Sequence, residues 1–247
     1  MSAVLLKGAE RILTMDGPDL VDTDIRLENG TITAIGTGLP AEGVDVVRVD
    51  GCILTPGLVN THHHLFQTLT RAVPAAQDAL LFGWLKELYP IWARFGPDEM
   101  RLAARIGLAE LALSGCTTSS DHMYLFPNGA RLDDSIEAAV DIGLRFHATR
   151  GAMSIGESLG GLPPDALVET EAEILEDCIR VIDRFHDPRP GAMLRVAVAP
   201  CSPFSVSRDL MRDAALLARD KGVGLHTHLA ENEEDVAYSL EMFGCRP

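Results

Sequence analysis

The sequence predicts an α/β protein, built as a (β/α)8 barrel of which about five β/α units are present, behind a small β domain. Residues 1–55 read as short strands with a hairpin signal between two of them. Residues 56–247 repeat a β-rich run followed by an amphipathic helix that stops at glycine, the rhythm of β/α units. The glycine fingerprint of a dinucleotide fold is absent from the first strand-to-helix turn, where histidines stand instead.

The composition is that of a globular protein: 247 residues, of which 47% are hydrophobic and 23% charged. A net charge of -15 argues against nucleic acid as a partner, because binding a polyanion needs a concentrated cationic face. No apolar run approaches the roughly 20 residues that span a bilayer, and the N-terminus lacks the pattern of a signal peptide. We therefore expect a cytoplasmic protein with no membrane partner, and a homo-oligomer is compatible with the sequence.

The five cysteines are scattered along the chain and form no C-x-x-C pair. This pattern predicts neither a disulfide framework nor a thiolate zinc site, and we expect most of them to be buried, reduced thiols. They are Cys52, Cys116, Cys178, Cys201 and Cys245.

The first domain, residues 1–55, is predicted to be small and β-sandwich-like. Its candidate strands lie within residues 3–15, 24–36 and 44–56. Asn29-Gly30 separates two alternating runs, which is the strongest short-range signal for a β-hairpin.

The second domain, residues 56–247, is predicted to be a partial (β/α) barrel. Helices are expected at residues 97–115, 174–185 and 207–222, the last with Ser207 as N-cap and Gly222 after its end. In the middle helix one apolar face is predicted to hold Ile174, Leu175, Cys178, Ile179, Ile182 and Phe185. The candidate strands are residues 57–64, 115–124, 144–151, 194–201 and 223–231.

Alternating strands and helices imply parallel pairing, which leaves an open doubly wound sheet or a barrel. The missing glycine fingerprint favours the barrel. A full barrel has eight strands in about 250 residues, whereas five are predicted here, so we expect the N-terminal portion of a longer enzyme.

Three consecutive histidines follow the first barrel strand. On a strand, residues i and i+2 share a face, so His62 and His64 are expected to project together while His63 faces the helix layer. The last predicted strand repeats the spacing with His226 and His228. His62, His64 and one of the second pair would supply three imidazole ligands at the barrel mouth, a set that suits zinc.

These residues carry a resemblance. "PGLVNTHHHLFQTLTR" and "HTHLAE", with the β domain in front of them, resemble the amidohydrolase superfamily, in its branch of zinc- or iron-dependent aminohydrolases that act on nitrogen heterocycles. The resemblance runs from end to end of the chain. The strings "FGWLKELYPIWARF", "SGCTTSSDHMYLFP", "TRGAMSIGESLGGLPP" and "VAPCSPFSVS" most resemble the bacterial 8-oxoguanine deaminases, with hydroxyatrazine ethylaminohydrolase-like proteins close behind.

The resemblance implies that residues 56–247 are the metal-dependent hydrolase domain, and it implies a role for each matching residue. His62, His64 and His228 match the metal ligands, for one Zn²⁺ per chain with Fe²⁺ as the alternative, and His226 then lies behind the ligands or packs in the core. Glu231 matches the carboxylate that acts as acid and base.

Two further positions are expected to contact the substrate. Gln67 matches a glutamine that hydrogen-bonds the base. Cys201-Ser202 fall where many guanine deaminases carry an Arg-Phe pair, a departure that favours a purine oxidised at C8.

Two elements of the family are expected to be absent: the sixth-strand histidine and the eighth-strand aspartate. Glu233, Glu234 and Asp235 are interpreted instead as the charged first turn of a helix. By this reading the chain holds about half of an active site.

The implied reaction is hydrolysis of a carbon–nitrogen bond other than a peptide bond, in a cyclic amidine. A metal-activated hydroxide attacks the amine-bearing carbon of a small heterocycle, most simply 8-oxoguanine or a guanine-like purine, and ammonia leaves. Two alternatives stay open: hydrolysis of an s-triazine amine or chloride, and an inactive fragment that folds poorly or survives only as an assembly. A binding module that needs no metal is a third idea, and the clustering of the histidines argues against it.

Several residues near these motifs are not assigned to the site. Trp84, Tyr89 and Trp92 stand at helical spacing and are interpreted as core anchors. For His122 and Tyr124 a substrate role and a structural role are both open. His147 and His186 stand alone in the sequence and are interpreted as structural.

Overall fold

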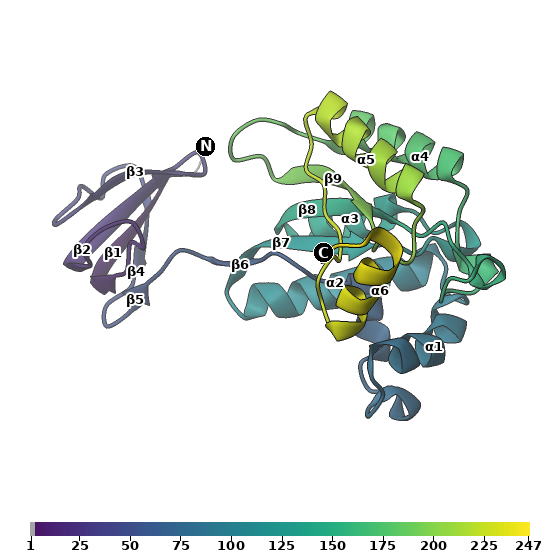
Figure 1. The fold of residues 1–247 in the computed structure, drawn as a ribbon. Coiled ribbons are helices and arrows are strands. Elements are labelled where there is room, and N and C mark those ends of the chain that lie inside the picture. The colour runs from purple at the N-terminus through teal and green to yellow at the C-terminus, as the bar shows by residue number, and fades with distance from the viewer. Residues whose placement is uncertain (1–2) are drawn as a thin grey trace. The chain divides into compact units, whose positions relative to one another are not determined.

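The computed structural model describes residues 3–247, and the chain divides into two compact units, Met1–Gly57 and Leu58–Pro247 (Figure 1). No helix among the described residues is both long and apolar enough to cross a membrane.

The first unit is a five-stranded sheet in the order β3-β2-β1-β4, with β5 also pairing with β1. The two-residue turn between β2 and β3 is made by Asn29 and Gly30, at φ of 53° and 77°. Both values lie in the left-handed region that a type I′ hairpin requires, so the predicted hairpin is confirmed. The strands are β1 Ala3–Ile12, β2 Leu20–Glu28, β3 Thr31–Gly36, β4 Asp45–Arg48 and β5 Ile53–Leu54.

The second unit contains a parallel sheet whose order, β6-β7-β8-β9, follows the order of the chain. A doubly wound sheet reverses its strand order at a switch point, whereas a barrel adds each strand beside the previous one. The order therefore matches the predicted arc of a (β/α) barrel. The strands are β6 Leu58–Asn60, β7 Cys116–Met123, β8 Arg145–Ala152 and β9 Leu194–Pro200.

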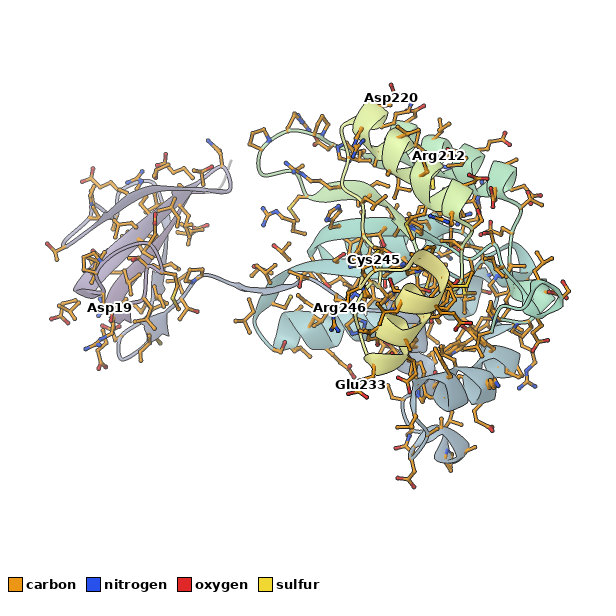
Figure 2. The ribbon with its side chains drawn as sticks, in the orientation of Figure 1. Asp19, Arg212, Asp220, Glu233, Cys245 and Arg246 are labelled. Atoms are coloured by element: carbon orange, nitrogen blue, oxygen red, sulfur yellow. The ribbon has the colours of Figure 1, made fainter. Side chains whose placement is uncertain are left out.

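Helices follow each strand and cover the sheet (Figure 1). Charged side chains lie on the outer surface of α5 (Arg208–Lys221), among them Arg212 and Asp220 (Figure 2). The helices are α1 Leu81–Trp92, α2 Pro97–Leu113, α3 Leu132–Ile142, α4 Glu171–Phe185, α5 Arg208–Lys221 and α6 Glu233–Phe243, with short 3-10 turns that include Leu65–Thr70.

The expected ends of α5 are confirmed. The Ser207 hydroxyl accepts a hydrogen bond from the Leu210 N–H at 2.9 Å, and Gly222 ends the helix at a φ of 66°. The expected face of α4 is right except at Ile179, which is 39% exposed, while Val181 is buried in its place. Ile179 lies one residue past Cys178, about 100° around the helix from that buried side chain, and so faces away from the sheet.

The fifth predicted strand is not a regular strand. Residues 223–229 run beside β9 but form only one bridge with it, between Val198 and Leu225. Three backbone hydrogen bonds still hold the segment in place. They are Val198 N–H to Gly224 O, His226 N–H to Val198 O and His228 N–H to Cys201 O, at 2.9 to 3.1 Å.

Candidate metal centre

His62 and His64 lie in the loop where β6 ends and the first 3-10 turn begins. Strand β6 stops at Asn60, and the Asn60 side chain accepts a hydrogen bond from the His62 N–H at 3.2 Å. The two imidazole rings project together, with centroids 4.7 Å apart. The His63 ring instead lies near Gly107 on α2, in the helix layer.

His228 brings the third imidazole from the segment beside β9. Its Nε2 atom lies 3.2 Å from the Nε2 of His64 and 3.3 Å from the Nε2 of His62. Three nitrogens from residues far apart in the sequence therefore face one point. The three residues form a group that offers one ligand atom each to a metal ion.

The other ring nitrogen of two of these histidines is already engaged. Nδ1 of His64 lies 2.6 Å from the His122 carbonyl oxygen, and Nδ1 of His228 lies 2.7 Å from the Cys201 carbonyl oxygen. A carbonyl only accepts, so each Nδ1 carries the proton and each Nε2 presents a lone pair. Two lone pairs 3.2 Å apart repel each other and do not form a hydrogen bond.

A cation removes this repulsion. Metal–nitrogen bonds of 2.0–2.1 Å in tetrahedral geometry place two ligand nitrogens about 3.3 Å apart, which is the spacing observed between these Nε2 atoms. A carbonyl bonded to the far nitrogen is also how metal-binding histidines are commonly oriented. The donor set therefore fits a divalent metal that prefers imidazole.

The electrostatics keep the rings of His62 and His64 neutral. Burial is the main cause that lowers the pKa of His64 to about 3, partly opposed by its hydrogen bond to the His122 carbonyl. Burial and the neighbouring His228 lower the pKa of His62 to about 4. Near pH 7 both rings are neutral imidazoles, the form that binds a metal.

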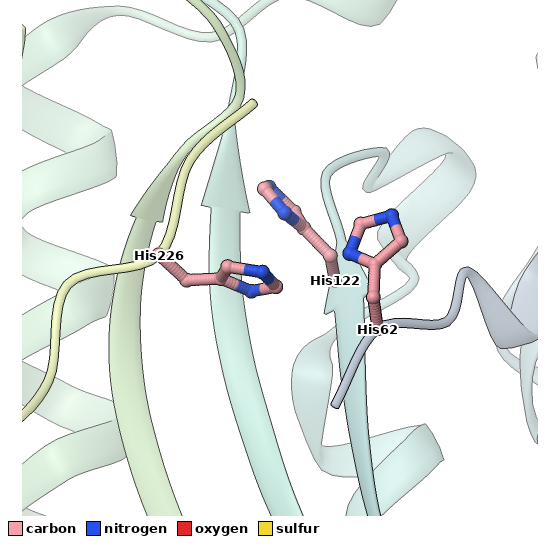
Figure 3. A group of neighbouring side chains, drawn as sticks. All are labelled: His62, His122 and His226. Atoms are coloured by element: carbon pink, nitrogen blue, oxygen red, sulfur yellow. The ribbon is translucent and has the colours of Figure 1, made fainter. Parts of the chain in front are cut away.

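Two more histidines stand beside this centre. His62, His122 and His226 form a second group, and their rings point toward one another in Figure 3. The His122 ring is fully buried, stacks on His228 with centroids 4.6 Å apart, and has no hydrogen-bond partner at either nitrogen within residues 3–247. The sequence left the role of His122 open; its place at the carboxyl end of β7 was the available signal.

A cavity of about 290 Å³ opens beside the three imidazoles. Its lining combines polar groups with apolar and aromatic side chains, which is typical of a small-molecule site. The cavity is lined by His62, His64, Gln67, Leu81, Trp84, Leu85, Tyr89, Tyr124, Met153, Leu162, Pro163, Cys201, Ser202, Phe204, Ser205, His228 and Glu231.

The structure brings Glu231 to this cavity as an exposed side chain on the loop before α6. The Asp235 carboxylate accepts hydrogen bonds from the backbone N–H groups of Glu231, at 2.7 Å, and of Asn232, at 3.3 Å. These contacts hold the loop while leaving the Glu231 carboxylate free of a hydrogen bond to the described residues. Glu233, Glu234 and Asp235 form the first turn of α6, as expected.

Gln67 and Cys201 lie on the same cavity wall. The Gln67 amide nitrogen donates to the Tyr124 hydroxyl at 3.3 Å. Burial raises the pKa of Cys201 to about 12, so its side chain is a neutral thiol near pH 7. Its sulfur lies 3.8 Å from Nδ1 of His228.

The interpretation of two aromatic residues as core anchors is confirmed, but it is incomplete. Tyr89 is buried in the hydrophobic core and Trp84 packs against that core, and both side chains also line the cavity. Helical spacing alone does not distinguish a core face from a cavity wall. Trp92 is the core anchor expected: it is fully buried and donates from Nε1 to the Thr70 hydroxyl at 3.0 Å.

Comparison with known proteins places these features in a family. Residues 53–246 match the model of the Amidohydrolase family. The chain is 42% identical over 250 residues to 8-oxoguanine deaminase of Pseudomonas aeruginosa, covering 100% of this chain and 56% of that protein. It is 38% identical over 250 residues to hydroxydechloroatrazine ethylaminohydrolase of a Pseudomonas species, covering 94% and 52%.

A solved structure supports the fold. The crystal structure of atrazine chlorohydrolase from Arthrobacter aurescens, complexed with zinc, superposes with a TM-score of 0.90 at 34% identity, over 99% of this chain and 56% of that one. The chain therefore spans about half the length of the relatives that it matches.

Proposed function

The chain belongs to the amidohydrolase family, and we propose that it provides the metal-binding half of a hydrolytic deaminase that releases ammonia from a nitrogen heterocycle. The observation that carries the proposal is the convergence of three imidazole nitrogens beside a cavity that also holds a free carboxylate. A binding module has no need for lone pairs held in this way.

We propose His62, His64 and His228 as the ligands of one zinc ion, with iron as the alternative. Imidazole is a good ligand for either metal, and the orientation of His64 and His228 by backbone carbonyls supports this assignment. The zinc-bound crystal structure of a relative at 34% identity favours zinc. When bound, such a metal acidifies a water ligand and so supplies a nucleophile at neutral pH.

Glu231 is proposed to move the proton. Its carboxylate shares the cavity with the three histidines and accepts no hydrogen bond from the described residues, so it is available to a substrate. It would protonate the ring nitrogen beside the attacked carbon and pass a proton to the departing ammonia. The hydrogen bonds from Glu231 and Asn232 to Asp235 keep its backbone in place while it does so.

The cavity wall is proposed to orient a flat ring. Trp84, Tyr89 and Phe204 present aromatic surface, and the Gln67 amide can read the amide-like edge of a purine. The Cys201 thiol is neutral, so it offers this wall a weak hydrogen-bonding group and no charge. Together with the 42% identity to an 8-oxoguanine deaminase, these features favour 8-oxoguanine over guanine. The 38% identity to a hydroxyatrazine-type enzyme keeps an s-triazine as the second candidate.

The proposal is tested on the zinc-loaded chain, with metal content measured by plasma mass spectrometry and ammonia release followed with 8-oxoguanine, guanine and an aminotriazine. About one zinc per chain and preferential ammonia release from 8-oxoguanine are expected. Zinc binding without ammonia release, but with saturable binding of 8-oxoguanine, would assign to this chain the metal and ligand site alone. Absence of zinc at micromolar free metal would refute the three-histidine centre.

A further inference from the structure

We propose that Asp121 is a positioning residue for this metal centre, because its buried carboxylate fixes the backbone directly after His64 and so aims the His64 imidazole. The inference rests on the proposed function, and it adds a residue to which no metal or substrate contact is assigned.

His64 lies in a stretch without regular backbone pairing. The ladder between β6 and β7 ends at Asn60, and the 3-10 turn begins only at Leu65. His64 itself has φ of -121° and ψ of 83°, outside the helical region. Its orientation must therefore come from contacts other than a sheet or helix.

Residues Asp121 and His122 at the end of β7 provide those contacts. The Asp121 carboxylate accepts a hydrogen bond from the Leu65 N–H at 2.8 Å. The His122 N–H donates to the His63 carbonyl at 2.7 Å, and the His122 carbonyl accepts from Nδ1 of His64 at 2.6 Å. The three bonds hold His64 from both sides along the backbone and at its ring.

Only one of these three bonds uses a side chain of β7, that of Asp121. The Leu65 N–H is one of the first donors of a helical turn, which have no partner within the turn. Leu65 is fully buried, so water cannot replace the missing acceptor, and Asp121 is fully buried as well. Loss of the carboxylate would leave a buried donor unpaired, and the backbone would move to regain a partner.

A displacement of Leu65 changes the direction of His64. The Leu65 side chain packs closely against Gly107 of α2. The space between them is so small that a Cβ added to Gly107 would lie 2.7 Å from the Leu65 Cδ2 atom. Relief of an unpaired N–H therefore has to come from the loop that carries His64. Groups that orient a ligand in this way typically change metal affinity by about 10- to 100-fold when they are removed.

The test compares Asp121→Ala, Asp121→Leu and Asp121→Asn by competition for Zn²⁺ against a chromophoric chelator. The first two remove the acceptor, and the zinc dissociation constant is expected to rise about 10-fold or more. Asparagine keeps an oxygen acceptor of the same reach, so Asp121→Asn is expected to stay within about threefold of the unmodified chain. Asp121→Ala adds no bulk, so it can replace Asp121→Leu in the test if the leucine variant does not fold.

Asp134 supplies a matched control. Its carboxylate is also buried and accepts a backbone N–H, that of Arg131, at 2.8 Å, but it belongs to α3 and lies outside the histidine centre. Asp134→Ala is expected to lower the stability of the metal-free chain and to leave zinc affinity unchanged. The visible spectrum of the Co²⁺-loaded chain gives a second readout, which should change in Asp121→Ala and stay constant in Asp121→Asn and Asp134→Ala.

Each outcome decides the matter. Unchanged zinc affinity in Asp121→Ala, an equal loss in Asp134→Ala, or an equal loss in Asp121→Asn would overturn the positioning role while leaving the three-histidine centre intact. A chain that binds no zinc at all would instead refute the proposed function and this inference with it.

Discussion

The Nε2 atoms of His64 and His228 lie 3.2 Å apart, and each ring directs its Nδ1 atom at a backbone carbonyl, so neither Nε2 carries a proton when the rings are neutral. The fold thus holds two lone pairs in mutual repulsion. The free energy released when a cation relieves this repulsion is available for metal binding.

Replacing His228 with glutamine should weaken zinc binding by at least about 10-fold, because a nitrogen donor held toward the other two is lost. His147→Gln is the matched control, since His147 lies on β8 and belongs to none of the metal-binding groups found among residues 3–247. Chelator competition measures both variants. Equal zinc affinity in His228→Gln and the unmodified chain would contradict the assignment of this ligand.

Glu231→Gln should keep zinc binding and lose deaminase activity. An amide cannot carry the proton, and removal of a general acid–base group costs about 10²- to 10⁴-fold in rate. The loss is measured as the rate of ammonia release from 8-oxoguanine, in any active protein that contains this sequence. Glu234→Gln, an exposed carboxylate in the first turn of α6, is expected to behave like the unmodified protein; a similar rate loss there would argue against a specific role for Glu231.

Acid should destabilise the second unit through Asp177. Burial acts to raise the pKa of Asp177, but the hydrogen bond from Arg180 and the charge of Arg150 outweigh it and lower the pKa to about 2. A depressed pKa stabilises the fold above the unfolded value of about 3.9, and this stability is lost as the pH falls toward 2. The contribution at neutral pH is about 2 kcal/mol.

Asp177→Asn should remove this contribution, so urea unfolding at pH 7 is expected to show a loss of about 2 kcal/mol. The difference from the unmodified chain should shrink between pH 4 and pH 3. Asp209→Asn changes an exposed ion pair with Arg212 and should alter stability by less than about 0.5 kcal/mol. A difference that stays constant with pH would show that Asp177 acts through packing and not through its charge.

Gly151→Ala should destabilise the sheet by about 1 to 3 kcal/mol through overpacking. A Cβ at Gly151 would overlap the Met123 carbonyl oxygen, a backbone atom of the neighbouring strand that cannot rotate away. Gly83→Ala in α1 is the matched control: its Cβ would meet Ala79 at an ordinary 3.6 Å, and alanine favours the helix. Urea unfolding measures the stability of both variants. A Gly151→Ala chain as stable as the unmodified chain would contradict the prediction.

The sequence predicted what depends on local pattern. The caps of α5 at Ser207 and Gly222 and the hairpin at Asn29-Gly30 follow from backbone preferences within a few residues. The order of the strands follows from the predicted barrel, in which each strand is added beside the previous one.

Features that depend on distant neighbours were missed. Residues 223–229 have the composition of a strand, but only β9 pairs with them among the described residues, and regular pairing fails. Trp84 and Tyr89 show a helix period, which says nothing about whether the apolar face meets a core or a cavity. Asp121 is one polar residue in a strand, and only its contact with Leu65 reveals what it holds.

His64 and His228 are 164 positions apart in the chain. A metal ion held by both would act as a cross-link between the start and the end of the barrel segment, and it would close a loop of that length. Closing a long loop removes more conformational freedom from the unfolded chain than closing a short one, although the increase is slow. The three nitrogens meet only after β6 and the segment beside β9 have both docked on the intervening strands, so a metal would bind all three only when this part of the fold is complete. The bound metal would then slow unfolding.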